Sequence, residues 1–193
     1  MDPVDTYLRQ LAVVVQDMPR DEIWKVIQVL MDAWRRGSRV FLLGNGGSAA
    51  TASHMANDLN KLTIVPGQPR FKALALTDSV PLMTAWGNDT AYENIFCEQM
   101  LNFLEAGDVA IAISASGNSP NVLKAMQVAR EHGAITVGFS GRDGGRLKGL
   151  VDHCILVPSD HIGQQEDGHM ILDHLIATTL HQLVEEEAAC CGS

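Results

Sequence analysis

The sequence predicts an α/β fold in which a five-stranded parallel sheet lies between layers of helices. Short apolar runs alternate with longer segments of helical periodicity, which is the arrangement that builds parallel sheets. Several of these runs end in glycine, serine or asparagine, residues that suit a turn from a strand into a helix. The composition agrees, because 46% of the 193 residues are hydrophobic and 19% are charged, which is enough for a sizeable core.

Two amphipathic helices are predicted before the first strand. Apolar residues recur at helical spacing over residues 23–34, and Gly37 follows as a stop signal. An earlier apolar stripe covers residues 4–15. Neither belongs to the alternation that follows, so we expect residues 1–37 to form a helical hairpin that packs on the main domain or on another subunit.

The alternating pattern defines one domain over residues 38–187. The expected strands cover residues 40–43, 73–76, 109–113, 135–139 and 154–157. A helix follows the first strand to about residue 60, another begins at Pro120, and a long one runs from about residue 166 to 187. We expect the polar residues 188–193 to be a disordered tail.

Charge and cysteine usage exclude several classes of protein. The net charge of −9 opposes binding to phosphate backbones or anionic lipids, and the sequence has no basic cluster beyond Arg35-Arg36. The four cysteines form no C-x-x-C pair, the first residues are acidic rather than apolar, and the longest apolar runs are too short to span a bilayer. We therefore expect a soluble cytoplasmic protein that does not bind nucleic acid.

The segment Asn45-Gly46-Gly47-Ser48 is the first candidate ligand loop, because ligands of open parallel sheets bind at the carboxyl ends of strands. Its glycines let backbone N–H groups approach an anion at the start of a helix. The stretch from Gly44 to Ala49 also matches a dinucleotide fingerprint. That fingerprint needs an acidic residue about 20 positions on, whereas the next strand ends at Asp78, so we disfavour this alternative.

The second candidate loop is Ser114-Ala115-Ser116-Gly117-Asn118-Ser119-Pro120. Its three hydroxyls and its backbone N–H groups converge at a helix start, which predicts a phosphate cradle that lacks the lysine of a P-loop. The alternative is that Ser119 only caps the helix. The two functions are compatible, and three serines exceed what a cap needs.

Acid–base and metal-ligating candidates lie on two of the predicted helices. His54 and Asp58 are four residues apart and share a helix face. Glu166, His169 and His174 lie on the last helix, where the two histidines are separated by about 140° and are not expected to face one site. For any single histidine here, a packed or solvated position is the alternative.

Together these residues resemble a sugar isomerase (SIS) domain, a flavodoxin-like three-layer fold, and within that superfamily the phosphoheptose isomerases. The motifs that carry the resemblance are, in order, Gly44-Asn45-Gly46-Gly47-Ser48, His54-x-x-x-Asp58, Gly87-Asn88-Asp89, Ser114-x-Ser116-Gly117-Asn118-Ser119, Gly141-x-Asp143-Gly144-Gly145 and His169-x-x-x-x-His174. From the residues alone, Asn88-Asp89 could simply start a helix and Asp143 could serve a turn.

The resemblance implies an activity and a set of substrate contacts. Enzymes of this family interconvert sedoheptulose 7-phosphate and a heptose 7-phosphate, are typically homotetramers with active sites between subunits, and often carry zinc. The positions that match the family's substrate contacts are Asn45, Gly46, Gly47, Ser48, Asn88, Asp89, Ser114, Ala115, Ser116, Ser119 and Glu166.

The resemblance also implies one zinc ion per subunit, held by His54, Asp58, Glu166 and His174. Asp58 stands where the family has glutamate, and Glu166 stands where it has glutamine; Gln165 would match only with an inserted residue. Two histidines and two carboxylates remain a suitable zinc set. The matching roles are Asp58 as the base and His174 as the acid of an aldose–ketose isomerisation through an enediol.

Three other functions compete with this one. The superfamily contains non-catalytic members that bind sugar phosphates or associate with a replication initiator. It also contains isomerases of other ketose phosphates. A binding protein would not need both the His54/Asp58 pair and His174. Since all three are present, we rank the phosphoheptose isomerase first and a dinucleotide-dependent oxidoreductase last.

Overall fold

A five-stranded parallel sheet forms the centre of the computed structural model, which describes residues 2–191. The strands are β1 (Arg39–Gly44), β2 (Lys72–Ala75), β3 (Val109–Ile113), β4 (Ile135–Gly141) and β5 (His153–Val157). Their order in the sheet is β2-β1-β3-β4-β5, the order of flavodoxin-like doubly wound folds, so the predicted fold class is confirmed. The third strand has the predicted bounds, and the others differ by a few residues at their ends.

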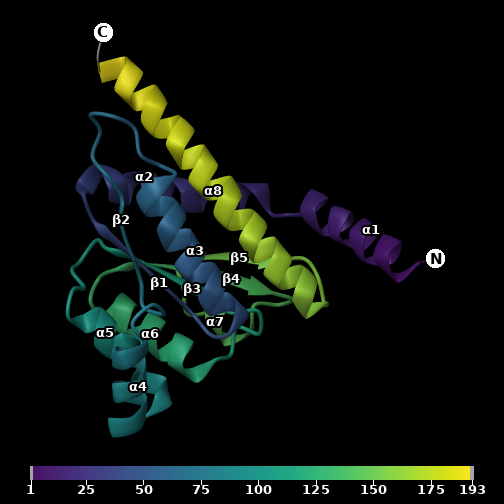
Figure 1. Ribbon diagram of the computed structural model, residues 1–193, viewed down its shortest axis with the longest axis horizontal. Helices are drawn as coiled ribbons and strands as arrows, with labels where there is room; N and C mark the ends of the chain where they lie inside the picture. Colours follow the sequence, from purple (N-terminus) through teal and green to yellow (C-terminus); the bar gives the residue numbers. More distant parts are fainter. Residues whose placement is uncertain (1, 192–193) are drawn as a thin grey trace.

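Helices cover both faces of the sheet (Figure 1). They are α1 (Pro3–Gln16), α2 (Arg20–Arg36), α3 (Gly47–Lys61), α4 (Val80–Asp89), α5 (Cys97–Leu101), α6 (Pro120–Glu131), α7 (Gly145–Lys148) and α8 (Ile162–Cys191), with a short 3-10 helix η1 (Tyr92–Asn94). Alternate residues of each strand point to opposite faces. In β1, Val40 and Leu42 pack against α2, α3 and α8, whereas Phe41 and Leu43 pack against α5, α6 and α7.

The first two helices differ from the predicted hairpin. They follow one another without folding back, and both contact α8 (Figure 1). The hydroxyl of Tyr7 donates to the Asp167 carboxylate at 2.6 Å, and Nε2 of Gln164 donates to the side-chain oxygen Oε1 of Gln10 at 3.1 Å. Three residues separate α1 from α2, and the anchoring side chains on α8 set the direction of α1.

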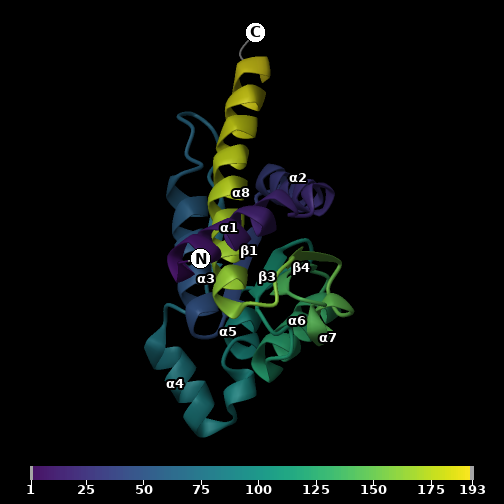
Figure 2. The same cartoon turned by 90° about the vertical axis from the view of Figure 1, so that its right-hand side faces the viewer.

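The last helix is longer than the sequence predicted. It begins at Ile162 and continues to Cys191, so the expectation of disorder is wrong for residues 188–191, while residues 192 and 193 lie outside the described part. Figure 2 shows the C-terminal end of α8 extending past the rest of the fold. Its apolar face continues through Leu180 and Val184, both of which are buried.

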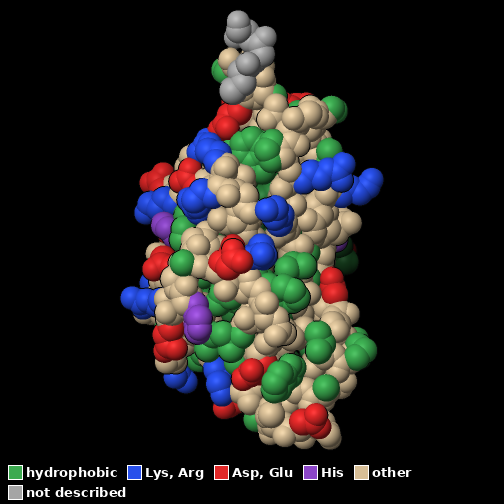
Figure 3. Space-filling model, turned by 90° about the vertical axis from the view of Figure 1, so that its left-hand side faces the viewer, with side chains coloured by type: hydrophobic (Ala, Val, Ile, Leu, Met, Phe, Trp, Pro, Cys, Tyr) green, Lys and Arg blue, Asp and Glu red, His purple; other side chains and the backbone are tan. Residues whose placement is uncertain are grey.

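Exposed hydrophobic side chains include one group around α4 and α5 and another on α1. On the face shown in Figure 3 they gather around α4 and α5, and the exposed residues there include Val80, Leu82 and Phe103. On α1, Val4 and Leu8 are exposed while Val14 is the buried residue. Among residues 2–191 no helix is both long and apolar enough to cross a membrane.

Candidate active site

Four titratable side chains meet where α3 and α8 lie side by side. His54 and Asp58 come from α3, and Asp173 and His174 come from α8. One potential ligand atom from each of the four lies within 4.8 Å of the others. The Nε2 atoms of His54 and His174 are 3.1 Å apart, and Nε2 of His54 lies 3.6 Å from Oδ2 of Asp58. We call these four residues the α3/α8 cluster.

The α3/α8 cluster fits a divalent metal. Two nitrogens bound to one tetrahedral zinc at 2.0–2.1 Å lie about 3.3 Å apart, close to the separation of the two histidines. The Asp173 side chain is buried, and neither of its carboxylate oxygens has a hydrogen-bond partner. Burial, with the nearby charge of Asp58, raises the pKa of Asp173 to about 7. A bound cation would supply the partner that this carboxylate lacks.

Three of the four predicted metal ligands meet in this cluster, and the fourth does not. His54, Asp58 and His174 are together, but the Glu166 carboxylate lies against Gly47, where an added Cβ would be 2.8 Å from Oε1. Glu166 is eight residues before His174, about 12 Å along a helix. The structure brings Asp173 to the cluster instead. Asp173 was not among the predicted ligands, although an aspartate on the apolar stripe of α8 could have indicated a metal site.

His169 and Gln165 also lie outside the α3/α8 cluster. His169 is buried, packs its ring on Phe139 and has no side-chain hydrogen-bond partner. Burial lowers its pKa to about 4, so the ring is neutral at physiological pH. It does not share a site with His174, as its spacing predicted. Gln165 donates from Nε2 to the Ser159 carbonyl oxygen at 2.7 Å.

The loop after β1 is held rigidly beside the start of α3. Gly46 has a φ of 56°, which suits glycine, and α3 begins at Gly47. The side chains of Asn45 and Asn121 exchange two hydrogen bonds of 2.9 and 2.8 Å, and the Tyr92 hydroxyl donates to Asn45 at 3.2 Å. Ser48 is buried in the first turn of α3.

The serine loop after β3 keeps polar groups available at the start of α6. Ser119 occupies the N-cap position, yet its side chain makes no capping hydrogen bond, so the capping interpretation is not supported. Ser116 is exposed, and its Oγ accepts from the backbone N–H of Asn118 at 3.3 Å. Ser114 is buried beneath the loop, where its carbonyl oxygen accepts from the Ser140 hydroxyl at 2.7 Å.

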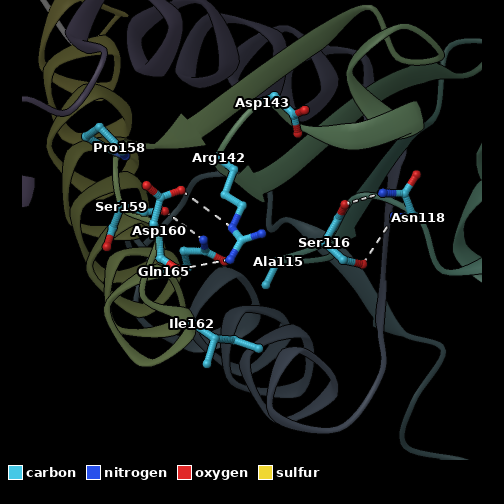
Figure 4. A pocket seen from close by; sticks show the side chains of 10 residues that line it. All are labelled: Ala115, Ser116, Asn118, Arg142, Asp143, Pro158, Ser159, Asp160, Ile162 and Gln165. Atoms are coloured by element: carbon cyan, nitrogen blue, oxygen red, sulfur yellow. Dashed lines mark hydrogen bonds and ion pairs between the residues drawn. The ribbon is translucent and has the colours of Figure 1, made fainter.

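A cavity of about 900 Å³ opens beside the serine loop (Figure 4). Ala115, Ser116 and Asn118 line it on one side, and Ser159, Asp160 and Gln165 line it on the other. Arg142 reaches between the two sides. The cavity is large enough for a sugar phosphate.

Asn88 and Asp89 are exposed at the end of α4, rather than starting a helix. The Asn88 amide donates to the Asp89 carboxylate at 2.9 Å. Within residues 2–191 no hydrogen bond or ion pair joins their side chains to the other predicted site residues. Asp143 does serve a turn, since its Oδ1 accepts from the Gly145 N–H at 3.1 Å.

Comparison with known proteins shows the family of this chain. The SIS domain family matches residues 6–141, more than half of the chain, so the protein is a SIS-domain protein. Phosphoheptose isomerase of Paramagnetospirillum magneticum is 40% identical over 157 residues, 81% of each chain. That of Pelobacter propionicus is 36% identical over 187 residues, 91% of this chain and 94% of the relative.

Solved structures give the same result. The phosphoheptose isomerase of Neisseria gonorrhoeae superimposes with a TM-score of 0.86 at 26% identity, over 93% of this chain and 97% of that one. The enzyme of Francisella tularensis gives the same TM-score and identity, over 93% and 96%. Within the SIS-domain proteins, the chain belongs to the phosphoheptose isomerase family.

Proposed function

We propose that this protein is an aldose–ketose isomerase that converts sedoheptulose 7-phosphate to D-glycero-D-manno-heptose 7-phosphate through an enediol. The α3/α8 cluster carries the proposal, because it supplies a carboxylate and histidines at one place. A protein that only binds sugar phosphates does not need such a group. The relatives named phosphoheptose isomerase support the choice of substrate.

The chemistry follows from these side chains. Asp58 removes a proton from C1 of the ketose while His174 donates one to the oxygen at C2, which gives the enediol. Return of the carbon proton to C2 and loss of the hydroxyl proton from O1 complete the aldose. We assign the serine loop, with Ser116 and Ser119, to the phosphate, whose binding orients the reacting end of the sugar.

The loop after β1 and two further positions complete the proposed substrate contacts. Asn45, whose side chain is fixed by Asn121, and the Gly46-Gly47 backbone are assigned to the sugar hydroxyls. We assign Glu166, which lies against Gly47, to the same hydroxyls. Asn88 and Asp89 are assigned to a substrate in a neighbouring subunit.

We further propose one zinc ion per subunit at the α3/α8 cluster. His54, Asp58, Asp173 and His174 would hold it, and Asp173 replaces the Glu166 of the sequence prediction. When bound, the metal would polarise the substrate's carbonyl oxygen. The orphaned oxygens of Asp173 support this choice of ligand.

The proposal includes a cytoplasmic homotetramer. The exposed apolar residues Val4 and Leu8 on α1 and Val80 and Leu82 on α4 would be covered by neighbouring subunits. Light scattering of the purified protein tests the tetramer. A monomer at micromolar concentration would contradict it.

The Asp58→Asn variant tests the proposed function. Loss of the base should abolish turnover of sedoheptulose 7-phosphate while binding of the ester remains measurable, because the serine loop is untouched. Asp32→Asn is the matched control, since Asp32 is exposed on α2, where it pairs with Arg35, and the variant should keep full turnover. Full activity of Asp58→Asn would refute the assignment. Saturable binding without turnover in the wild type would favour a sugar-phosphate-binding protein.

A further inference from the structure

The turn after β4 holds Arg142 in an unusual backbone conformation. Arg142 is the one non-glycine residue in the described part of the chain with a positive φ, 51°. The turn is closed by a hydrogen bond of 2.9 Å from the Gly144 N–H to the Gly141 carbonyl oxygen, and Arg142 is its second residue. Glycine is usual where that position has a positive φ. Such strain persists where a side chain has a use, most often at binding sites.

Backbone contacts fix this turn to the serine loop. The Gly141 N–H donates to the Ala115 carbonyl oxygen at 3.1 Å, and the Leu147 N–H donates to that of Gly117 at 2.9 Å. An added Cβ at Gly117 would overlap the Gly144 carbonyl oxygen, so the two loops touch through their backbones. The backbone of Arg142 is therefore held at a set place beside the proposed phosphate site.

The charges around the cavity leave Arg142 without a strong partner. Its Nε lies 3.6 Å from Oδ1 of Asp160, and its Nη2 donates to the Asp160 carbonyl oxygen at 3.3 Å. Both side chains are exposed, at 63% and 96%, so this ion pair is weak. Asp143 and Asp160 also line the cavity, and without Arg142 their charges would repel an anion.

We propose that Arg142 binds the phosphate of the substrate, together with the serine loop, and so makes the cavity selective for phosphorylated sugars. The inference rests on the proposed function, since it takes the ligand to be a phosphomonoester. A phosphomonoester carries a charge of about −1.5 to −2 at neutral pH, and a planar guanidinium can donate two hydrogen bonds to it. The phosphate draws Arg142 away from Asp160, and the loop hydroxyls complete the cradle.

Calorimetric titration with sedoheptulose 7-phosphate tests the proposal. Loss of a charge-assisted contact in Arg142→Ala should weaken Kd by about 10- to 100-fold and reduce its salt dependence. Arg142→Lys should recover part of the affinity. Arg146→Ala is the matched control: it removes the same charge four residues on, at a separate cavity beside Lys124, and should leave Kd unchanged. Unphosphorylated sedoheptulose should bind all four proteins alike.

A stability measurement separates binding from folding. Arg142→Gly removes the side chain while relieving the strain at φ 51°, so it should weaken Kd as much as Arg142→Ala without lowering the melting temperature. Asp160→Asn should tighten binding, because it frees Arg142 from its partner.

The outcomes distinguish this inference from the proposed function. Wild-type affinity in Arg142→Ala would overturn the role of Arg142 and leave the isomerase intact. If the wild type does not bind sedoheptulose 7-phosphate, the proposed function fails, and the same variants are titrated with fructose 6-phosphate and inorganic phosphate. Equal binding of those anions by wild type and Arg142→Ala, or no binding at all, would overturn the inference as well.

Discussion

The buried carboxylate of Asp173 gives a sharp prediction for protein freed of metal with a chelator. Burial and the charge of Asp58 raise its pKa to about 7, from 3.8 in an exposed aspartate. Between these two values the folded state binds more protons than the unfolded state, so folding stability falls as pH rises. Replacing the group by its neutral isostere in Asp173→Asn removes this pH dependence.

The magnitude follows from proton linkage. With the folded pKa near 7, the wild type should lose on the order of 2–3 kcal/mol relative to Asp173→Asn between pH 5 and pH 8. Above pH 7 the metal-free variant should therefore be the more stable protein. With saturating zinc the wild type should be the more stable protein, because the variant lacks a charged ligand.

Urea unfolding followed by circular dichroism, with chelator or with zinc, measures both effects. Asp160→Asn is the control, since Asp160 is exposed and should not change the pH profile. If Asp173→Asn is less stable than the wild type at every pH without metal, the carboxylate has partners that the structure does not show. If zinc stabilises both proteins equally, Asp173 is not a ligand.

Two other features predict stability changes. Burial lowers the pKa of His169 to about 4, so between pH 6.5 and pH 4 the unfolded state binds more protons than the folded state. The free energy of unfolding should therefore fall as the pH is lowered through this range. In urea titrations, His169→Leu should show a smaller fall. If the steep loss of stability at acid pH persists in His169→Leu, other groups cause it. Gly117→Ala, with φ at 62° and a Cβ overlapping Gly144, should destabilise the fold by on the order of 2–3 kcal/mol. Gly67→Ala, at φ 82° with open space around its Cβ, should lose only about 1 kcal/mol, and equal losses in the two variants would contradict the loop contact.

Local patterns predicted the sheet well because the three central strands, β1, β3 and β4, are buried on both faces. In a chain of this length, an uninterrupted apolar run such as residues 109–113 is stable as a strand that helices cover on both faces. Its bounds agree with β3. The shared face of His54 and Asp58 is likewise a local property of one helix, and the structure keeps it.

Contacts between residues far apart in the sequence could not be predicted from local patterns. Asp173 joins His54 only because α3 and α8 lie side by side, and no spacing along the chain encodes that contact. The direction of α1 depends on Asp167 and Gln164 of the last helix, so two helices joined by a short link did not form a hairpin. Asn88 and Asp89 suit both ends of a helix, and only the structure shows that they end α4.

Incubation with sedoheptulose 7-phosphate in deuterated water, followed by NMR, is the most direct test of isomerisation by this protein. With zinc supplied, new heptose 7-phosphate signals should appear at a catalytic rate. Deuterium should enter the carbon next to the carbonyl whenever the abstracted proton exchanges, and Asp58→Asn should show neither change. Saturable binding of the ester with neither conversion nor deuterium uptake in the wild type would contradict isomerisation by this protein.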